Sequence, residues 1–171
     1  MDDLTQLAHA ARAGDQQALE QLITETYQQV WAFCAAVVRP DRAGTLTEAV
    51  FVQAVQSLPK FWGKAEALTW LLTIARRTCL EELRAHRPRR PARDSPSDPT
   101  NQPLPAGPDD AIHDLVEPLD TTRRVVFALT QLATLSYEQA AEVCGCPRDI
   151  IRLNMIDARE TLLAGSGGEL G

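Results

Sequence analysis

The feature that most constrains the fold of this chain is the spacing of its apolar residues. They recur every three or four residues, as on the buried face of an α-helix, and no segment alternates with the two-residue period of a β-strand. The chain is therefore expected to be all-α. The clearest case lies between residues 15 and 39, where the expected buried stripe consists of Leu19, Leu22, Ile23, Tyr27, Val30, Trp31, Cys34, Val37 and Val38.

Capping residues and helix breakers divide the first half of the chain into four expected helices. Asp15 is expected to cap the second helix, which Pro40 then stops. Thr45 and Glu48 have the spacing of a capping box, which predicts that the third helix starts at Thr45. These signals predict a four-helix domain over residues 1–87. The expected helices cover about residues 3–13, 15–39, 45–58 and 66–86.

Composition changes sharply between residues 88 and 108. This segment holds seven of the eleven prolines in the chain and almost no large apolar side chains. Such a segment cannot bury enough apolar surface to offset the entropy that it would lose on ordering. We therefore expect a flexible linker over residues 88–108.

A second small helical domain is expected over residues 109–165. Asp109 or Asp110 is expected to cap its first helix, and Asp120 its second. The glycine-rich residues 166–171 are expected to form a disordered tail. The core positions expected in the first two helices are Ile112, Leu115, Val116, Val125, Val126, Leu129 and Leu132.

The strongest local signal lies in residues 135–159. Ser136 is a good N-cap, and Gln139 three residues later completes a capping box. Gly145 is placed to end that helix in the left-handed conformation, and Pro147 suits the first turn of the next helix. Two helices joined by so tight a turn form either an ordinary helical hairpin or a helix-turn-helix, which commonly puts its second helix into a DNA major groove.

Two segments far apart in the chain match the same protein family. The segment Phe61–Arg77 (FWGKAEALTWLLTIARR) resembles the promoter-melting region of bacterial sigma factors of the extracytoplasmic-function (ECF) type. In that family an aromatic-x-Gly loop leads into a helix carrying Thr-Trp-Leu-x-x-Ile-Ala-Arg. The segment Leu135–Pro147 resembles the family's fourth region, with its Leu-Ser-Tyr-x-x-Ala-Ala-x-x-x-Gly-Cys-Pro pattern. The resemblance implies a region 2-like domain followed by a region 4-like helix-turn-helix domain.

The resemblance also implies partners, namely RNA polymerase core and promoter DNA. In the family, the helix that matches residues 46–55 docks on the clamp helices of the largest polymerase subunit, and the second domain meets the flap of the second-largest subunit. The implied polymerase-binding residues are Leu46, Glu48 and Phe51. The family pattern in this helix is Asp-Leu-x-Gln-Glu-x-Phe, and here much of its polar set is missing, so docking is expected to be weaker or differently distributed.

Region 2 of the family also faces the promoter −10 element. Holding a flipped base of opened DNA requires a pocket on a rigid helical base together with cations that hold the strand. Trp70 is expected to pack between helices instead. The implied −10 residues are Phe61, Trp62 and Lys64 on the loop and Arg76, Arg77 and Arg84 on the following helix.

The expected recognition helix departs further from the family. The implied −35 residues are Arg148, Arg152, Asn154 and Arg159, but Asp149, Asp157 and Glu160 balance the three arginines. Each lost phosphate contact weakens DNA binding and flattens its salt dependence. With Ile151, Met155, Ala158 and Leu162 expected in the core, two apolar residues fall on the outward face of this helix, where a protein partner is the more natural contact. These two residues are Leu153 and Ile156.

The charge distribution indicates that nucleic acid contacts the first half of the chain. The net charge is −6, yet residues 1–90 hold 11 basic and 10 acidic side chains, a balance of +1. Counterion-driven contact with nucleic acid should therefore centre on the arginines between residues 76 and 90. The alternative reading of these arginines is a solvated helix end, where cations favour the macrodipole.

The sequence indicates neither a metal site nor a membrane-spanning segment. Cys34 and Cys79 fall on apolar helix faces and are expected to be buried thiols, while Cys144 and Cys146 lack the second ligand pair of a zinc site. We expect no metal and no cofactor. The chain has no apolar run long enough to span a membrane and no leader-like N-terminus, so a cytoplasmic protein is expected.

Two functions are compatible with these features. The first is an ECF sigma factor that binds polymerase core and directs promoter-specific initiation. The second is a sigma-like interaction protein that has lost autonomous promoter recognition and needs or regulates a partner, such as an anti-sigma factor or co-activator on its second domain. An enzyme is not expected, because no paired carboxylates, Cys-His arrangement or phosphate-binding glycine loop stands out.

Overall fold

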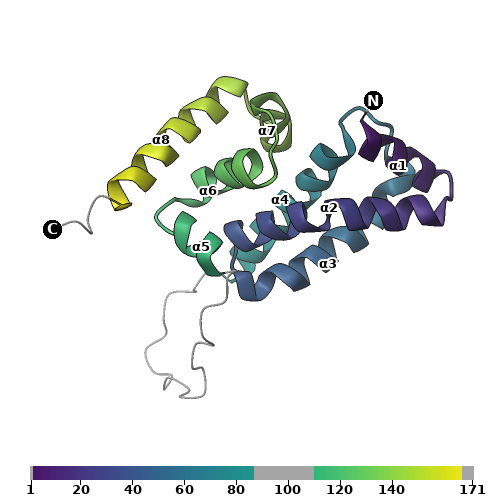
Figure 1. The fold of residues 1–171 in the computed structure, drawn as a ribbon, viewed down its shortest axis with the longest axis horizontal. Helices are drawn as coiled ribbons and strands as arrows, with labels where there is room; N and C mark the ends of the chain where they lie inside the picture. Colours follow the sequence, from purple (N-terminus) through teal and green to yellow (C-terminus); the bar gives the residue numbers. More distant parts are fainter. Residues whose placement is uncertain (1, 87–109, 167–171) are drawn as a thin grey trace, which may run out of the picture.

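The structure is a computed structural model that describes residues 2–86 and 110–166. Within these two ranges every regular element is a helix and no strand is present, which confirms the all-α prediction (Figure 1). The linker expected over 88–108 lies outside the described residues, as does the expected tail beyond Ser166. The elements are α1 (Asp3–Arg12), α2 (Gln16–Val37), α3 (Pro40–Ser57), η1 (Leu58–Lys60), α4 (Ala67–Ala85), α5 (Asp110–Val116), α6 (Thr121–Phe127), η2 (Ala128–Leu132), α7 (Tyr137–Cys144) and α8 (Arg148–Ser166).

The first half is a bundle in which α2, α3 and α4 pack side by side and α1 crosses one end (Figure 1). The predicted cap of α2 is confirmed, because an Asp15 carboxylate oxygen accepts the Ala18 N–H at 3.1 Å. Gly14 takes φ +103° in the turn between α1 and α2, where a side chain would be strained. The inner stripe of α2 is confirmed except at Tyr27, which is exposed and stacks on Phe51 with ring centroids 6.1 Å apart.

The predicted start of the third helix is wrong. Helix α3 begins at Pro40, five residues before the expected cap at Thr45. Proline fits the first turn of a helix because its fixed φ suits that position and its missing N–H has no intrahelical partner there. The same Pro40 therefore ends one helix and opens the next, and the Thr45–Glu48 pair lies inside α3.

The second half is built around the helix-turn-helix formed by α7 and α8. The predicted capping box is confirmed: Ser136 Oγ accepts the Gln139 N–H at 3.1 Å, and Gln139 Oε1 accepts the Ser136 N–H at 2.8 Å. Gly145 ends α7 with φ +64°, as the left-handed cap requires. Before it, α6 passes into a π-helical turn, η2, which the sequence analysis did not predict. Leu115 of α5 was expected in the core but is exposed, whereas Val116 is buried as expected.

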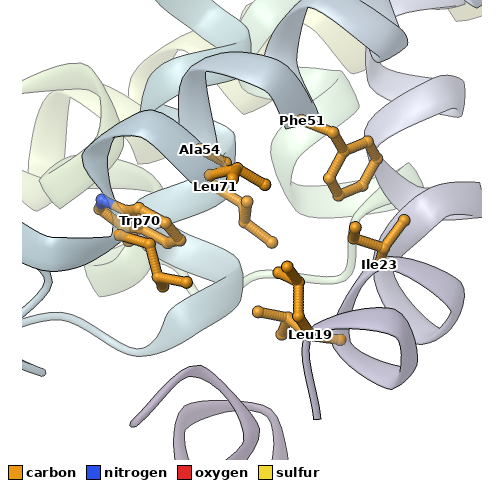
Figure 2. A pocket seen from close by; sticks show the side chains of 9 residues that line it. Leu19, Ile23, Phe51, Ala54, Trp70 and Leu71 are labelled. Carbon is orange, nitrogen blue, oxygen red and sulfur yellow. The ribbon is translucent and has the colours of Figure 1, made fainter. Parts of the chain in front are cut away.

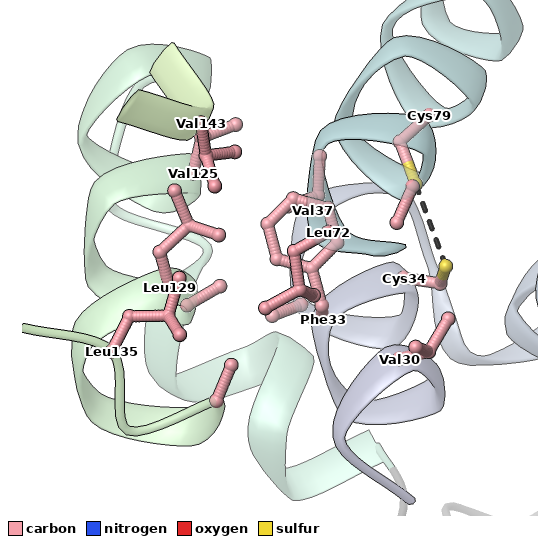
Figure 3. Packing of buried hydrophobic residues seen from close by; sticks show 14 of the residues in the cluster. Val30, Phe33, Cys34, Val37, Leu72, Cys79, Val125, Leu129, Leu135 and Val143 are labelled. Carbon is pink, nitrogen blue, oxygen red and sulfur yellow. Dashed lines mark hydrogen bonds between the residues drawn. The ribbon is translucent and has the colours of Figure 1, made fainter. Parts of the chain in front are cut away.

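The two halves share one apolar core. Figure 3 shows Phe33 and Leu72 of the first half lying opposite Leu129 and Leu135 of the second. All four side chains are at most 6% exposed. The separate cores expected for two domains are thus in contact, and burial of this apolar surface stabilises the arrangement.

Two buried thiols support the first half of this core. The Cys79 thiol donates to Cys34 Sγ at 3.6 Å between α4 and α2 (Figure 3). The hydrogen bond to Cys34 and burial raise the pKa of Cys79, so this thiol stays protonated. Both cysteines are fully buried, which confirms their expected role as small apolar core residues.

Candidate nucleic-acid interface

The loop between η1 and α4 presents the side chains expected to face the −10 element. Trp62 is 68% exposed, although a tryptophan would ordinarily be at least half-buried, and Lys64 is exposed two residues later. Gly63 separates them with φ +68°, a conformation that favours glycine. The loop therefore presents an aromatic face and a cation on the same short turn.

The prediction for Phe61 is corrected by its position. Its side chain is only 4% exposed and lies between the rings of His9 and Trp70, with centroid distances of 5.3 Å and 4.9 Å. Phe61 therefore fixes the start of the loop and presents no surface to DNA. Sequence reasoning grouped it with Trp62 because the two aromatic residues are adjacent, and only the packing separates them.

Trp70 packs between helices, as expected. Figure 2 shows its indole beside Leu71 of the same helix, in an apolar space that Leu19 and Ile23 of α2 also line. This packing places the first turns of α4 firmly against α2 and α3. The loop that precedes α4 is consequently carried on a rigid base.

The arginines of α4 come together along one side of the helix. Arg76, Arg77 and Arg84 line a surface groove of about 320 Å³ together with Thr73 and Glu81. Arg77 and Arg84 are exposed. The Arg77 guanidinium donates to Gln53 Oε1 at 3.0 Å, which holds it against α3. Three of the arginines that were singled out from the sequence therefore line one groove.

Arg76 lies where α4 meets the second half of the molecule. Its Nε–H is buried and has no hydrogen-bond partner within the described residues. Its guanidinium lies near Cys144 of α7, and both line a second space of about 270 Å³ between α4 and the helices α6 and α8. Burial raises the pKa of the Cys144 thiol to about 11, against the lowering effect of the Arg76 charge. Part of the expected DNA surface is therefore covered in this arrangement.

Two of the four residues expected to read the −35 element are held by contacts within the second half. The Arg148 guanidinium pairs with Glu138 of α7 at 3.1 Å, and the Asn154 side chain donates to the Ile150 carbonyl at 2.8 Å. Arg152 and Arg159 are exposed. An isolated pair of arginines offers few phosphate or base contacts compared with a cluster.

Two apolar residues lie on the outward face of α8, as the sequence predicted. Leu153 is 52% exposed and Ile156 is 46% exposed. The helix is anchored by the expected inner residues, of which Ile151, Met155 and Ala158 are buried. Two further exposed apolar residues, Ile150 and Leu163, lie on α8 and were not singled out from the sequence.

The expected polymerase-binding residues of α3 divide into two groups. Leu46 and Phe51 are buried at 4% and 8% exposure, so they hold α3 in the bundle. Glu48 is exposed. Val52 and Val55 follow it at helical spacing and are 57% and 43% exposed, so they share its face. Neither valine was singled out from the sequence as a contact residue.

Neither a metal site nor a membrane-spanning helix is present in the described residues. No cluster of three or more His, Cys, Asp or Glu side chains that could hold a metal ion occurs in residues 2–86 and 110–166. None of the helices in those same residues is long and apolar enough to cross a membrane.

Comparison with known proteins identifies the family. Residues 22–89 match the family model described as Sigma-70 region 2. The chain is 39% identical over 169 residues to the ECF RNA polymerase sigma factor SigC of Mycobacterium tuberculosis (strain CDC 1551 / Oshkosh), covering 94% of this chain and 90% of that protein. It is 26% identical to the ECF RNA polymerase sigma-E factor of Escherichia coli (strain K12), covering 91% of this chain and 90% of that protein.

Solved structures show the same fold. CnrH, solved in complex with the cytosolic domain of CnrY, aligns with a TM-score of 0.73 at 20% identity, over 98% of this chain and 99% of that chain. The sigma factor RpoE of Bartonella quintana, solved with the anti-sigma factor NepR, aligns with a TM-score of 0.69 at 19% identity, over 88% and 97%. Sigma factors direct a polymerase and are not themselves enzymes. The chain belongs to the ECF family of RNA polymerase sigma factors, which bind the polymerase core and direct promoter-specific initiation of transcription.

Proposed function

We propose that this sigma factor opens promoter DNA mainly through its first half, with Trp62 and Lys64 as the −10 contacts. The observation that carries the proposal is the 68% exposure of Trp62 on a loop whose neighbours are firmly packed. An exposed indole offers a face on which an unpaired base stacks, and such stacking contributes about 1–3 kcal/mol per base. Lys64 then supplies a nearby charge for the phosphates of the opened strand.

The groove along α4 extends this surface. Arg77 and Arg84 hold the strand beyond the loop, and Arg76 joins them once α7 no longer covers it. Polymerase docks on the exposed face of α3 that contains Glu48, Val52 and Val55. This face combines a charge with apolar side chains, which partly replaces the polar set missing from the family pattern.

The second half contributes less sequence-specific binding. Arg148 is paired with Glu138, and Leu153 occupies the outward face where an arginine would read a guanine. We assign to Arg152, Asn154 and Arg159 a weak contact with the −35 element, and to the domain as a whole a contact with the polymerase flap. The factor acts in the cytoplasm, where bacterial polymerase works.

Transcription in vitro with purified core polymerase tests the proposal. Trp62→Ala in the full chain is expected to lower transcript yield from a duplex promoter by about tenfold, because the lost stacking is worth about 1–3 kcal/mol. Leu163→Ala, which removes another highly exposed apolar side chain, is the matched control and should leave the yield unchanged. Binding of both variants to core polymerase should equal that of the wild type. An unchanged yield with Trp62→Ala would overturn the role given to the loop.

A second candidate function for α8 rests on its exposed apolar residues. Leu153 and Ile156 lie within one turn of each other on the outward side of α8, and a protein partner would cover such a pair of apolar side chains. We propose that an anti-sigma factor or co-activator binds there, since the structurally similar RpoE was solved with the anti-sigma factor NepR. The test is co-purification from the native host, with Leu153→Glu and Ile156→Glu together expected to abolish recovery of the partner. Recovery at the wild-type level would contradict it.

A further inference from the structure

Helix α1 contacts the DNA-facing loop at its start, in its middle and at its end. Three of its residues, Thr5, His9 and Arg12, follow one another at spacings of four and three, so they lie on a single face of the helix. Each contacts a different part of the segment between η1 and α4. Helix α1 lies outside the Sigma-70 region 2 match, which begins at residue 22, and the sequence analysis gave it no function.

The end of the loop is held by Thr5. Helix α4 has no side-chain cap of its own at Glu66, but the Ala67 N–H donates to Thr5 Oγ1 at 2.9 Å. The Thr5 hydroxyl in turn donates to Asp2, which caps α1. Because Thr5 and Ala67 are both buried, this hydrogen bond fixes the point at which the loop enters α4.

The middle of the loop is held by His9. A Cβ atom at Gly63 would lie 2.6 Å from His9 Nε2, which shows how closely the imidazole covers the loop backbone. The same ring packs against Phe61 at 5.3 Å. Gly63 therefore satisfies two requirements at once, a positive φ and a place for the imidazole.

The start of the loop is held by Arg12. Its Nε–H donates to the Pro59 carbonyl at 3.2 Å, and its guanidinium lies 3.8 Å from the centroid of the Trp62 ring. A guanidinium over an indole is a favourable cation–π contact, and here it covers one face of the ring. Because Trp62 is still 68% exposed, the opposite face remains open. One covered and one open face form a platform on which a single base stacks.

We propose that α1 is a brace for the DNA-facing loop and that Arg12 is a positioning residue, which holds the indole of Trp62 ready to stack on an unpaired promoter base. The proposal deepens the function assigned to the loop above and rests on it. Without Arg12 the exposed indole would sample several rotamers and lie partly against its own loop. Stacking would then require that side chain to be ordered at the moment of opening, which costs conformational entropy.

The test compares two templates in open-complex formation by full-length protein with core polymerase. One is a duplex promoter that the wild type transcribes, and the other is the same promoter with a non-complementary bubble across the −10 element. Arg12→Ala is expected to lower open complex on the duplex by about fivefold, the size of an exposed cation–π contact with its hydrogen bond, and by less than about twofold on the bubble. Arg12→Lys keeps the cation but not the bond to Pro59, and should recover part of the loss. Arg39→Ala removes a different arginine, which forms an exposed ion pair with Asp41, and is the matched control.

The decisive measurement is the double variant. If Arg12 acts through Trp62, Arg12→Ala adds no loss in a Trp62→Ala background. Losses that multiply, equal losses on both templates, or normal opening with Arg12→Ala while Trp62→Ala is defective would each overturn the positioning role and leave the proposed function of the loop intact. Normal opening with Trp62→Ala would instead overturn the function of the loop, and this inference with it.

Discussion

The two halves of this sigma factor are similar in architecture but differ in the surfaces that they present to nucleic acid. The first half presents an aromatic residue and a cation on a braced loop, followed by a groove with three arginines. The second half has a well-formed helix-turn-helix whose outward face carries Leu153 and Ile156, and Arg148 of its second helix is paired with Glu138. A DNA-binding fold and a DNA-binding surface are therefore separate properties. The fold depends on buried apolar residues and helix caps, whereas the surface depends on exposed charge.

The largest expected effect concerns the apolar core that joins the halves. Phe33→Ala should lower the free energy of unfolding by about 3–5 kcal/mol, the usual cost of removing a buried phenyl ring. Because Phe33 lies in the cluster that includes Leu129, hydrogen exchange should accelerate in α6 and η2 as well as in α2. Leu22→Ala, in the separate cluster beside α1, is the control and should accelerate exchange mainly in α1 and α2. Faster exchange confined to the first half in both variants would show that the halves are independent.

The second prediction would make the surfaces of the two halves alike. Leu153→Arg with Asp157→Arg adds two cations to α8 and removes one carboxylate, which breaks the 3.2 Å ion pair between Asp157 and Arg123. Arg123 keeps its second ion pair, with Asp120 at 2.9 Å. Full-length protein should then bind duplex DNA more tightly by about tenfold or more, since a well-placed arginine contributes about 1–3 kcal/mol. The slope of affinity against salt concentration should steepen, because more counterions are released.

Fluorescence anisotropy with a labelled promoter duplex at several salt concentrations measures both effects. Leu163→Arg adds a cation near the C-terminal end of the same helix and serves as the control for charge alone. Tight, sequence-specific binding of the −35 element by the unmodified α8 at physiological salt would contradict the difference drawn between the halves.

The third prediction concerns pH at the contact between the halves. The pKa of Cys144 is raised by burial to about 11, from an ordinary value near 9, so the folded protein holds this proton more tightly than the unfolded chain does. The contribution of this thiol to the free energy of unfolding is therefore complete below about pH 9 and is lost as the pH rises through about 11. Since the thiol is half-buried and partly screened, we expect a loss of about 1 kcal/mol across this range.

Urea unfolding at a series of pH values checks this dependence. Cys144→Ala should flatten the part of the stability curve between pH 9 and 11 relative to the wild type, while other alkaline titrations remain in both proteins. Cys146→Ala is the matched control in the same turn. A curve of unchanged slope in Cys144→Ala would show that the thiol is not protected at this contact.

Much of the fold could be predicted from the sequence because it depends on local signals. Helix caps and apolar periodicity depend on neighbouring residues, and the caps at Asp15, Asp120, Ser136 and Gly145 were found where expected. The cap predicted at Thr45 was wrong. Pro40 is compatible both with the end of one helix and with the start of the next, and the local sequence does not show that it does both. The shared core could not be predicted, since it depends on contacts between residues about a hundred positions apart.

The candidate site was less predictable because exposure is decided by tertiary packing. Phe61 and Trp62 are adjacent and chemically alike, yet one is buried and the other is exposed. Leu46 and Val55 are aliphatic residues of the same helix, yet Leu46 is buried and Val55 is exposed. No motif indicated a function for Arg12. Its contact with Trp62 joins residues that are far apart in the sequence, so no local pattern predicts it.

The smallest expected effect separates two functions of one side chain at the contact between the halves. Gln139 completes the capping box of α7 through its Oε1, and its Nε2–H donates to the carboxylate of Glu66 at the start of α4. Gln139→Glu keeps an acceptor for the Ser136 N–H, so the cap survives, but it removes the donor and places two carboxylates together. We expect a loss of about 0.5–1 kcal/mol in unfolding free energy, because this contact is exposed and screened. Glu66→Gln in the same chain should restore the loss, since it returns a donor to the pair. If the double variant is as unstable as Gln139→Glu alone, the loss comes from the cap, and the polar contact does not help to hold the two halves together.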